Sequence, residues 1–159
     1  MQLVGVRVEV PANTPVVVLR EQTGLQRLLP IVIGNPEASS IHAALEGIES
    51  PRPLTHDLLV LVLGQLTATL SSVVITEIRD HVFFAELHLE VGDRTHIMSC
   101  RPSDAIALAA RTGSPIFATE AIMLEAGQAV EVDDDPDEAI IDEFLDFLDD
   151  LDPDDFKKT

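Results

Sequence analysis

The order of the predicted elements constrains this chain most, because the same order occurs twice. Three short strands precede an alanine-rich helix at residues 38–45, and three more precede a second such helix near residue 103. The strands alternate apolar with polar residues, as half-buried strands do, and turn-forming residues separate them. Hairpin-linked strands with helices between them indicate an α+β fold. We expect two pseudo-repeated units of three strands plus a helix, with a mostly antiparallel sheet and an additional amphipathic C-terminal helix.

The individual elements can be placed along the chain from periodicity and turn signals. Strands are expected over residues 4–10, 16–20, 27–33, 70–78, 82–91, 94–100 and 115–118. Helices are expected over residues 38–45, 55–66, 103–112 and 120–125. Pro30 cannot donate a backbone hydrogen bond, so the third strand is expected at a sheet edge or a bulge. The helix that begins at Thr55, its expected N-cap, is predicted to bury one face, which consists of Leu58, Leu59, Val62, Leu63 and Leu66.

The helix near residue 103 starts at a corner that concentrates charge. Pro102 disfavours helical geometry at Arg101, Ser103 is the expected N-cap, and Asp104 suits the positive end of the helix dipole. Thr112 and Gly113 are expected to end the helix. The corner presents a guanidinium, a hydroxyl and a carboxylate beside free backbone N–H groups, which is how an anion site is built. The same pattern also fits a capped helix with a local ion pair.

Composition narrows the classes of protein that this chain can belong to. Its 159 residues, 46% of them hydrophobic, suit one domain with a substantial core. The longest apolar run, residues 58–63, is too short to span a membrane. The single cysteine, Cys100, cannot form an internal disulfide, so a reducing cytoplasm is the expected compartment. Apart from two lysines at residues 157–158, every basic residue is an arginine, which argues against lysine-based catalysis in the body.

The net charge of −18 is unevenly distributed along the chain. Residues 133–159 hold 13 of the 28 acidic residues, so we expect a domain over residues 1–132 and a separate acidic extension over 133–159. Asp135, Pro136 and Glu138 form a strong helix-start signal. One apolar stripe follows, made of Ile140, Ile141, Phe144, Leu145, Leu148 and Leu151. Such a stripe needs a surface to dock on, in the body or in a second chain, and we expect a homodimer or other homo-oligomer.

Three carboxylates fall at the starts of predicted helices, namely Glu37, Asp57 and Asp104. Brought together, they could hold Mg²⁺ or Mn²⁺ through their oxygens. The chain has no glycine-rich phosphate loop, no His-Glu-x-x-His motif and no cysteine pair for zinc. Whether the three corners converge is open at this stage, and Asp57 also fits an ordinary first-turn residue.

Three ordered motifs resemble those of a known family. Residues 29–34 with the Glu37-Ala38 pair, then residues 52–57, then residues 101–108 are similar to the bifunctional nuclease family. The likeness extends over roughly residues 1–125, and the acidic extension resembles that of actinobacterial members. The resemblance implies a nuclease that acts on both DNA and RNA.

On this basis we expect metal-assisted hydrolysis of phosphodiester bonds. The three helix-start carboxylates would bind the metal, and His56 would be general base or acid. Arg52 and Arg101 would neutralise the scissile phosphate, with Ser103 as a further phosphate ligand and Asp104 in the catalytic set. The alternative is a non-catalytic regulatory or protein-binding module, in which the same motifs only shape the fold. In either case we expect no membrane association.

Overall fold

The computed structural model describes residues 1–9 and 13–129, and the first of its compact units runs from Met1 to Ala129. The strands are β1 (Gln2–Glu9), β2 (Thr14–Arg20), β3 (Leu28–Val32), β4 (Ala68–Arg79), β5 (Val82–Val91), β6 (Arg94–Cys100) and β7 (Ile116–Ala118). The helices are α1 (Asn35–Leu45), α2 (Thr55–Gln65), α3 (Pro102–Thr112) and α4 (Glu120–Ala126). The predicted α+β class is confirmed. The predicted acidic extension and its amphipathic helix lie outside the described residues, so the boundary at residue 132 stays a prediction.

The strands form two separate sheets. The first has the order β1-β2-β3 and is antiparallel, and β3 lies at its edge, as Pro30 predicted. The second has the order β6-β5-β4-β7, in which the first three strands form an antiparallel meander and β7 joins β4 in parallel. Asp80 and His81 connect β4 to β5 with φ angles of 50° and 64°. Two such residues in succession suit a tight hairpin turn whose twist matches that of the strands.

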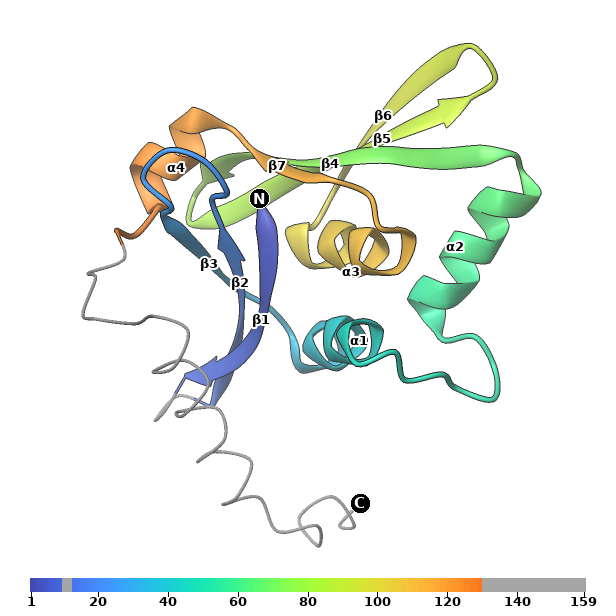
Figure 1. Ribbon diagram of the computed structural model, residues 1–159, viewed down its shortest axis with the longest axis horizontal. Coiled ribbons are helices and arrows are strands. Elements are labelled where there is room, and N and C mark those ends of the chain that lie inside the picture. The colour runs from blue at the N-terminus through green and yellow to red at the C-terminus, as the bar shows by residue number, and fades with distance from the viewer. Residues whose placement is uncertain (10–12, 130–159) are drawn as a thin grey trace, which may run out of the picture. The chain divides into compact units, whose positions relative to one another are not determined.

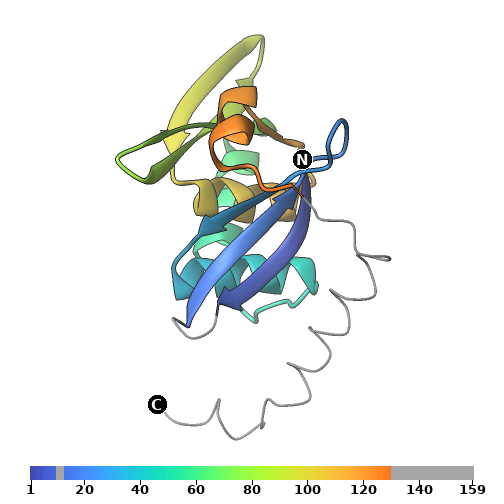
Figure 2. The ribbon, with the colours of Figure 1, turned by 90° about the vertical axis from the view of Figure 1, so that its left-hand side faces the viewer.

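Helices α1 and α3 occupy the space between the two sheets (Figure 1). Helix α1 packs against β1 and β2, α3 packs against β4 and β5, and the two helices pack against each other. Figure 2 shows the three-stranded sheet in front, on one side of these helices. The core is continuous through these layers, and its largest fully buried side chains are Leu19, Leu29, Ile41, Ile75, Ile106, Leu108 and Ile122.

The start of α3 differs by two residues from the prediction. Pro102 occupies the first helical turn and Arg101 is the N-cap, whereas Ser103 was expected there. Proline suits this position because its fixed φ is already helical and its missing N–H would have no partner. The helix ends at Gly113, with φ of 70°, as the sequence predicted.

The predicted buried face of α2 is wrong. None of its residues is buried, and the residues expected on the inner face include Leu58, which is 52% exposed, and Leu66, which is 65% exposed. Helix α2 lies at the side of α3 and β4, where Val60 and Leu63 contact the core. Nothing in the described chain covers its other side. Its N-cap is Leu54, whose backbone N–H donates to the Asp57 carboxylate three residues later, so Thr55 is already helical.

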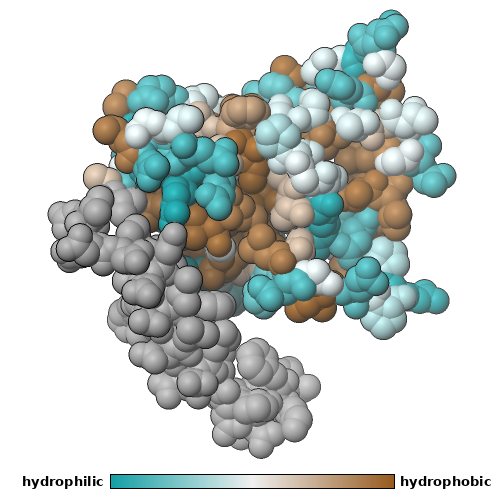
Figure 3. All heavy atoms as spheres, viewed as in Figure 1, coloured by the Kyte–Doolittle hydropathy of each residue, from teal (hydrophilic) through white to brown (hydrophobic). Residues whose placement is uncertain are grey.

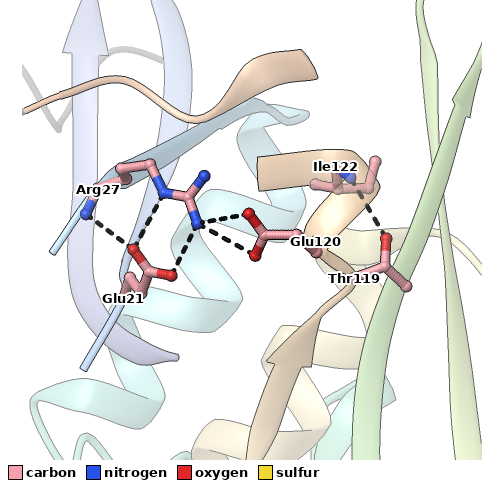
Figure 4. Close-up of polar contacts among 5 residues, drawn as sticks. All are labelled: Glu21, Arg27, Thr119, Glu120 and Ile122. Atoms are coloured by element: carbon pink, nitrogen blue, oxygen red, sulfur yellow. Dashed lines mark hydrogen bonds and ion pairs between the residues drawn. The ribbon is translucent and has the colours of Figure 1, made fainter. Parts of the chain in front are cut away.

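Ion pairs connect α4, the last described helix, to the sheet of β1, β2 and β3 (Figure 4). Arg27, just before β3, donates to Glu21 at 2.9 and 3.0 Å and to Glu120 of α4 at 3.2 Å. Thr119 caps α4 by accepting from the backbone N–H of Ile122. Backbone hydrogen bonds between Leu28 of β3 and Gln128, just after α4, connect the same two elements. These contacts lie apart from the charged helix starts that the motifs single out.

Candidate functional site

Polar side chains from the starts of three helices meet at one place. Helix α1 contributes Glu37 and Ser40, helix α2 contributes His56, and the start of α3 contributes Arg101 and Asp104. The side chains form one connected set of hydrogen bonds and ion pairs. The positive ends of three helix dipoles therefore point toward the same group of carboxylates, which favours ionised acids and bound anions there.

Arg101 bridges the two carboxylates of this set. Its guanidinium lies 2.9 Å from Glu37 Oε1 and makes hydrogen bonds of 2.8 and 2.9 Å to the two oxygens of Asp104. The Arg101 side chain is 66% exposed, whereas that of Glu37 is 15% and that of Asp104 is 29% exposed. The cation thus lies on the solvent side of two sheltered acids. A side chain at Gly34 would collide with the Glu37 carboxylate, so glycine there leaves the room that this carboxylate uses.

A second chain of hydrogen bonds links Ser40, His56 and Asp104. The Ser40 hydroxyl lies 2.9 Å from His56 Nδ1, and His56 Nε2 lies 3.3 Å from Asp104 Oδ1. A neutral imidazole carries one proton, and an ionised carboxylate can only accept. The proton of neutral His56 therefore lies on Nε2, toward Asp104, and Nδ1 accepts from the Ser40 hydroxyl. Both ring nitrogens are engaged, so Asp104 sets the tautomer, and Ser40 and Asp104 together fix the orientation of the ring.

Asp104 is held in its ionised form. Its partial burial by itself would raise the pKa of the carboxyl, but hydrogen bonds from Arg101 and His56 outweigh that effect and lower it below the usual range. The same carboxylate, together with burial as the larger cause, raises the pKa of the neighbouring Cys100 thiol to about 11. Cys100 is consequently a neutral thiol near neutral pH and is no candidate for a nucleophile.

Asp57 is not brought to the other two carboxylates. It pairs with Arg111 of α3, whose Nε lies 2.5 Å from Asp57 Oδ1, and it accepts from the backbone N–H of Leu54. These two contacts, the Arg111 bond first, lower the pKa of the Asp57 carboxyl. Within residues 1–9 and 13–129 no group of three or more His, Cys, Asp or Glu side chains is arranged to hold a metal ion. Mg²⁺ or Mn²⁺ binding stays a prediction, carried by Glu37 and Asp104.

The two remaining predicted phosphate ligands lie in different surroundings. Arg52 is exposed in the loop before α2, and it makes no ion pair with any residue that the structure describes. Ser103 is only 6% exposed, in the first turn of α3. Arg52 is therefore free to reach a phosphate in solvent, whereas Ser103 is sheltered by the packing of α3.

Sequence reasoning missed two residues that the structure places at or beside this site. Ser40 lies one turn after Glu37 on α1, and this spacing was the signal that both face the same way. Arg111 lies two turns after Asp104 on α3 and also donates to the carbonyl oxygen of Ala107. Its partner, Asp57, is 54 residues away in the chain, so no local pattern indicates the pair.

Comparison with known families shows the class of protein to which this domain belongs. A family model described as "Bifunctional nuclease domain" matches residues 17–131, and these residues contain all of the site residues named above. The chain belongs to the bifunctional nuclease domain family.

Particular relatives are found in bacteria and plants. An uncharacterised protein of Mycobacterium tuberculosis (strain CDC 1551 / Oshkosh) is 42% identical over 165 residues, which cover 100% of this chain and 98% of that protein. "Bifunctional nuclease 2" of Oryza sativa subsp. japonica is 32% identical over 108 residues, or 66% of this chain and 33% of that protein. "Bifunctional nuclease 2" of Arabidopsis thaliana is 29% identical over 117 residues, or 72% and 36%. The chain thus spans about a third of each plant protein.

Membrane insertion by a helix finds no support in the described residues. None of the helices in residues 1–9 and 13–129 is both long enough and apolar enough to cross a bilayer. The apolar run at residues 58–63, which the sequence analysis singled out as the longest, lies in α2, a helix of 11 residues.

Proposed function

We propose that this chain is a nuclease that hydrolyses phosphodiester bonds of DNA and RNA at the Arg101 site. One observation carries the proposal: Glu37, His56, Arg101 and Asp104 converge from three helix starts within the domain that relates the chain to proteins named bifunctional nucleases. The family membership supports the reaction class, and the geometry supports the location. A reducing cytoplasm is the compartment we propose, from the single free Cys100.

The exposed guanidinium of Arg101 is the proposed first contact of the substrate. Two non-bridging oxygens of a phosphate diester can accept paired hydrogen bonds from the planar fork of a guanidinium, and the Arg101 side chain is 66% exposed. Arg52, which makes no ion pair in the described chain, is placed on the loop before His56 and would add a second positive charge. These charges matter because the chain as a whole carries −18 and repels a polyanion elsewhere.

A divalent cation fits the donor set that Arg101 now bridges. When Arg101 turns toward a phosphate, Glu37 and Asp104 lose their shared cation, and two adjacent carboxylates are the ligands that Mg²⁺ or Mn²⁺ prefers. Such an ion would stabilise the charge that develops on the phosphoryl oxygens. Asp57 is engaged with Arg111, so its proposed part is to hold α2 and with it His56.

His56 is the proposed general base or acid, positioned by Ser40. Hydrolysis forms a bond from a water oxygen to phosphorus, breaks the bond to the leaving oxygen, and moves a proton from the water to the leaving group. Neutral His56 can take that proton only at Nδ1, where the Ser40 hydroxyl is now hydrogen-bonded at 2.9 Å. The Ser40 hydroxyl must therefore turn away for His56 to act as a base.

Cleavage of single-stranded RNA and DNA tests the proposal, with and without Mn²⁺ or Mg²⁺. Asp104→Asn should lower the rate by about 10²–10⁴-fold, the range of a lost acid–base or charged group. Asp93→Asn, in the exposed turn between β5 and β6, is the matched control and should cleave like the wild type. Cleavage unchanged by Asp104→Asn would place the chemistry elsewhere. A wild type without activity under either metal would favour the non-catalytic binding module.

A further inference from the structure

Helix α2 has more apolar surface than one copy of the chain can cover. Six consecutive aliphatic residues, 58–63, run through the helix, so every side of it is apolar. A helix that is apolar on all sides is characteristic of a buried position. Yet no residue of α2 is buried, and its exposed members with the flanking leucines are Leu54 at 50%, Leu58 at 52%, Leu59 at 40%, Leu61 at 55%, Val62 at 43% and Leu66 at 65%.

These side chains form one continuous face. Leu54, Leu58 and Leu61 follow the i, i+4, i+7 spacing along the side opposite to Val60 and Leu63, which contact the core. Apolar side chains are exposed at the side of the molecule where α2 lies (Figure 3). An exposed apolar patch of this kind on a soluble protein marks a contact surface. We call the six exposed residues from Leu54 to Leu66 the α2 face.

We propose that the α2 face is the interface between two copies of this chain, related by a twofold axis. The charge pattern favours a second copy over an unlike partner. No charged residue occurs from Leu58 to Thr76, and His56 and Asp57 at the start of α2 contact Asp104 and Arg111, respectively. A face without charge offers no feature that selects an oppositely charged partner. It can meet its own copy in a self-complementary twofold contact without burying an unpaired charge, which would be costly.

The size and composition of the face fit the centre of such an interface. A stable interface buries about 800 Å² on each partner, with an apolar, charge-depleted centre and a polar rim. Six large side chains, each 40–65% exposed and adjacent on one helix, supply the apolar centre. Polar residues at the two ends of the helix, Thr55 and Gln65, are exposed and supply part of the rim.

Pairing of two α2 helices would also stabilise the position of His56 in the candidate site. His56 lies on α2, and within one copy this helix is retained by Val60, Leu63 and the Asp57–Arg111 ion pair. Covering the outer side of α2 would hold the helix from both sides and fix His56 against Ser40 and Asp104. The pairing follows from the exposure of the α2 face and its lack of charge, and it does not depend on the nuclease activity.

The mass of the full chain in sedimentation velocity, from low to high micromolar concentration, tests this proposal. The wild type should sediment as a species of twice 17.3 kDa. Leu61→Glu places a charge in each half of the interface and should raise the dimer dissociation constant by about a hundredfold or more. Leu124→Glu is the matched control, because Leu124 of α4 is 75% exposed and lies outside the α2 face, and it should leave the mass unchanged.

Further variants separate this interface from other ways to associate. Leu61→Gln should weaken the dimer less than Leu61→Glu, and circular dichroism should show that both variants retain the fold. Ile97→Lys on the edge strand β6, where Ile97 is 59% exposed, should leave the dimer intact. A wild type that is monomeric at every concentration overturns the proposal. So does a dimer that survives Leu61→Glu or that dissociates with Ile97→Lys, because either result places the contact away from α2.

Discussion

Helices α2 and α3 have the same length and opposite burial. Each has 11 residues, but α3 has seven buried residues whereas α2 has none. Hydrophobic content does not explain the difference, because α2 has six consecutive leucines and valines while α3 relies on Ile106 and Leu108 among alanines. The alanines of α3 allow α1 and the strands β4 and β5 to approach closely on several sides. The burial of α3 follows from its position between the layers and from its small residues. A count of large apolar residues would have predicted that α2 is the more buried of the two helices.

The two helices also hold different parts of the candidate site. The start of α3, with Arg101 and Asp104, is fixed by a helix that is buried along most of its length. The start of α2, with His56, is attached to a helix that contacts the core on one side only. The part of the site that must hold charges in place is thus on the rigid element, and the imidazole is on the less constrained one.

Truncating one leucine in each helix should give the largest difference in stability between α2 and α3. Leu108→Ala in α3, at a fully buried position, should lower the free energy of unfolding by about 3–5 kcal/mol, because a cavity adds to the lost transfer energy. Leu61→Ala in α2 should lower it by less than about 1 kcal/mol for the monomer. Urea denaturation, at a concentration where sedimentation shows monomers, measures both. Similar losses for the two variants would mean that α2 is buried as fully as α3.

Local sequence signals predicted the elements of the fold well. Alternation, prolines and glycines placed all seven strands and four helices of the described chain, because these signals depend on neighbouring residues alone. The exposure of α2 could not be predicted, since leucine spacing gives a helix an apolar face but does not say whether the chain has anything to cover it. Pairing of β7 with β4 in parallel likewise depends on a crossover through α3.

The charged residues at the helix starts could be predicted from the sequence, but which of them contact one another could not. The residues Glu37, His56, Arg101 and Asp104 were singled out from helix-start motifs, and the structure brings these four together. Asp57 carries the same local signal and yet turns to Arg111. The packing of α2 against α3 decides which carboxylate contacts Arg101 and His56, and no local sequence motif indicates the outcome.

The ion pair between Asp57 and Arg111 is a polar link between α2 and α3, beside the His56–Asp104 hydrogen bond, and its loss should have an intermediate effect. Asp57→Asn should destabilise the fold by about 1–2 kcal/mol, since a hydrogen bond to a charged group is lost and Arg111 keeps a weaker acceptor. The lowered pKa of Asp57 makes this stabilisation present above the unfolded pKa near 3.9, and it is lost as pH falls through the folded pKa.

Urea denaturation at a series of pH values measures this dependence. The difference in unfolding free energy between the wild type and Asp57→Asn should be constant near neutral pH and should shrink below about pH 4. Glu77→Gln is the control, because its partner Arg79 is 61% exposed and the pair is on the surface of β4. That variant should change stability by less than about 1 kcal/mol at any pH. A difference for Asp57→Asn that persists undiminished to low pH would show that charge on Asp57 is not its cause.

The two helices also end differently, and this difference should give the smallest effect. Helix α3 ends at Gly113 with φ of 70°, a conformation that glycine adopts freely. Helix α2 is followed by Thr67 with φ of 53°, which is strained for a β-branched residue. Gly113→Ala should therefore destabilise the fold by about 1 kcal/mol, and Thr67→Gly should stabilise it by up to about 1 kcal/mol. Thermal unfolding of the two variants measures both shifts, and equal signs would show that backbone strain does not distinguish these two helix ends.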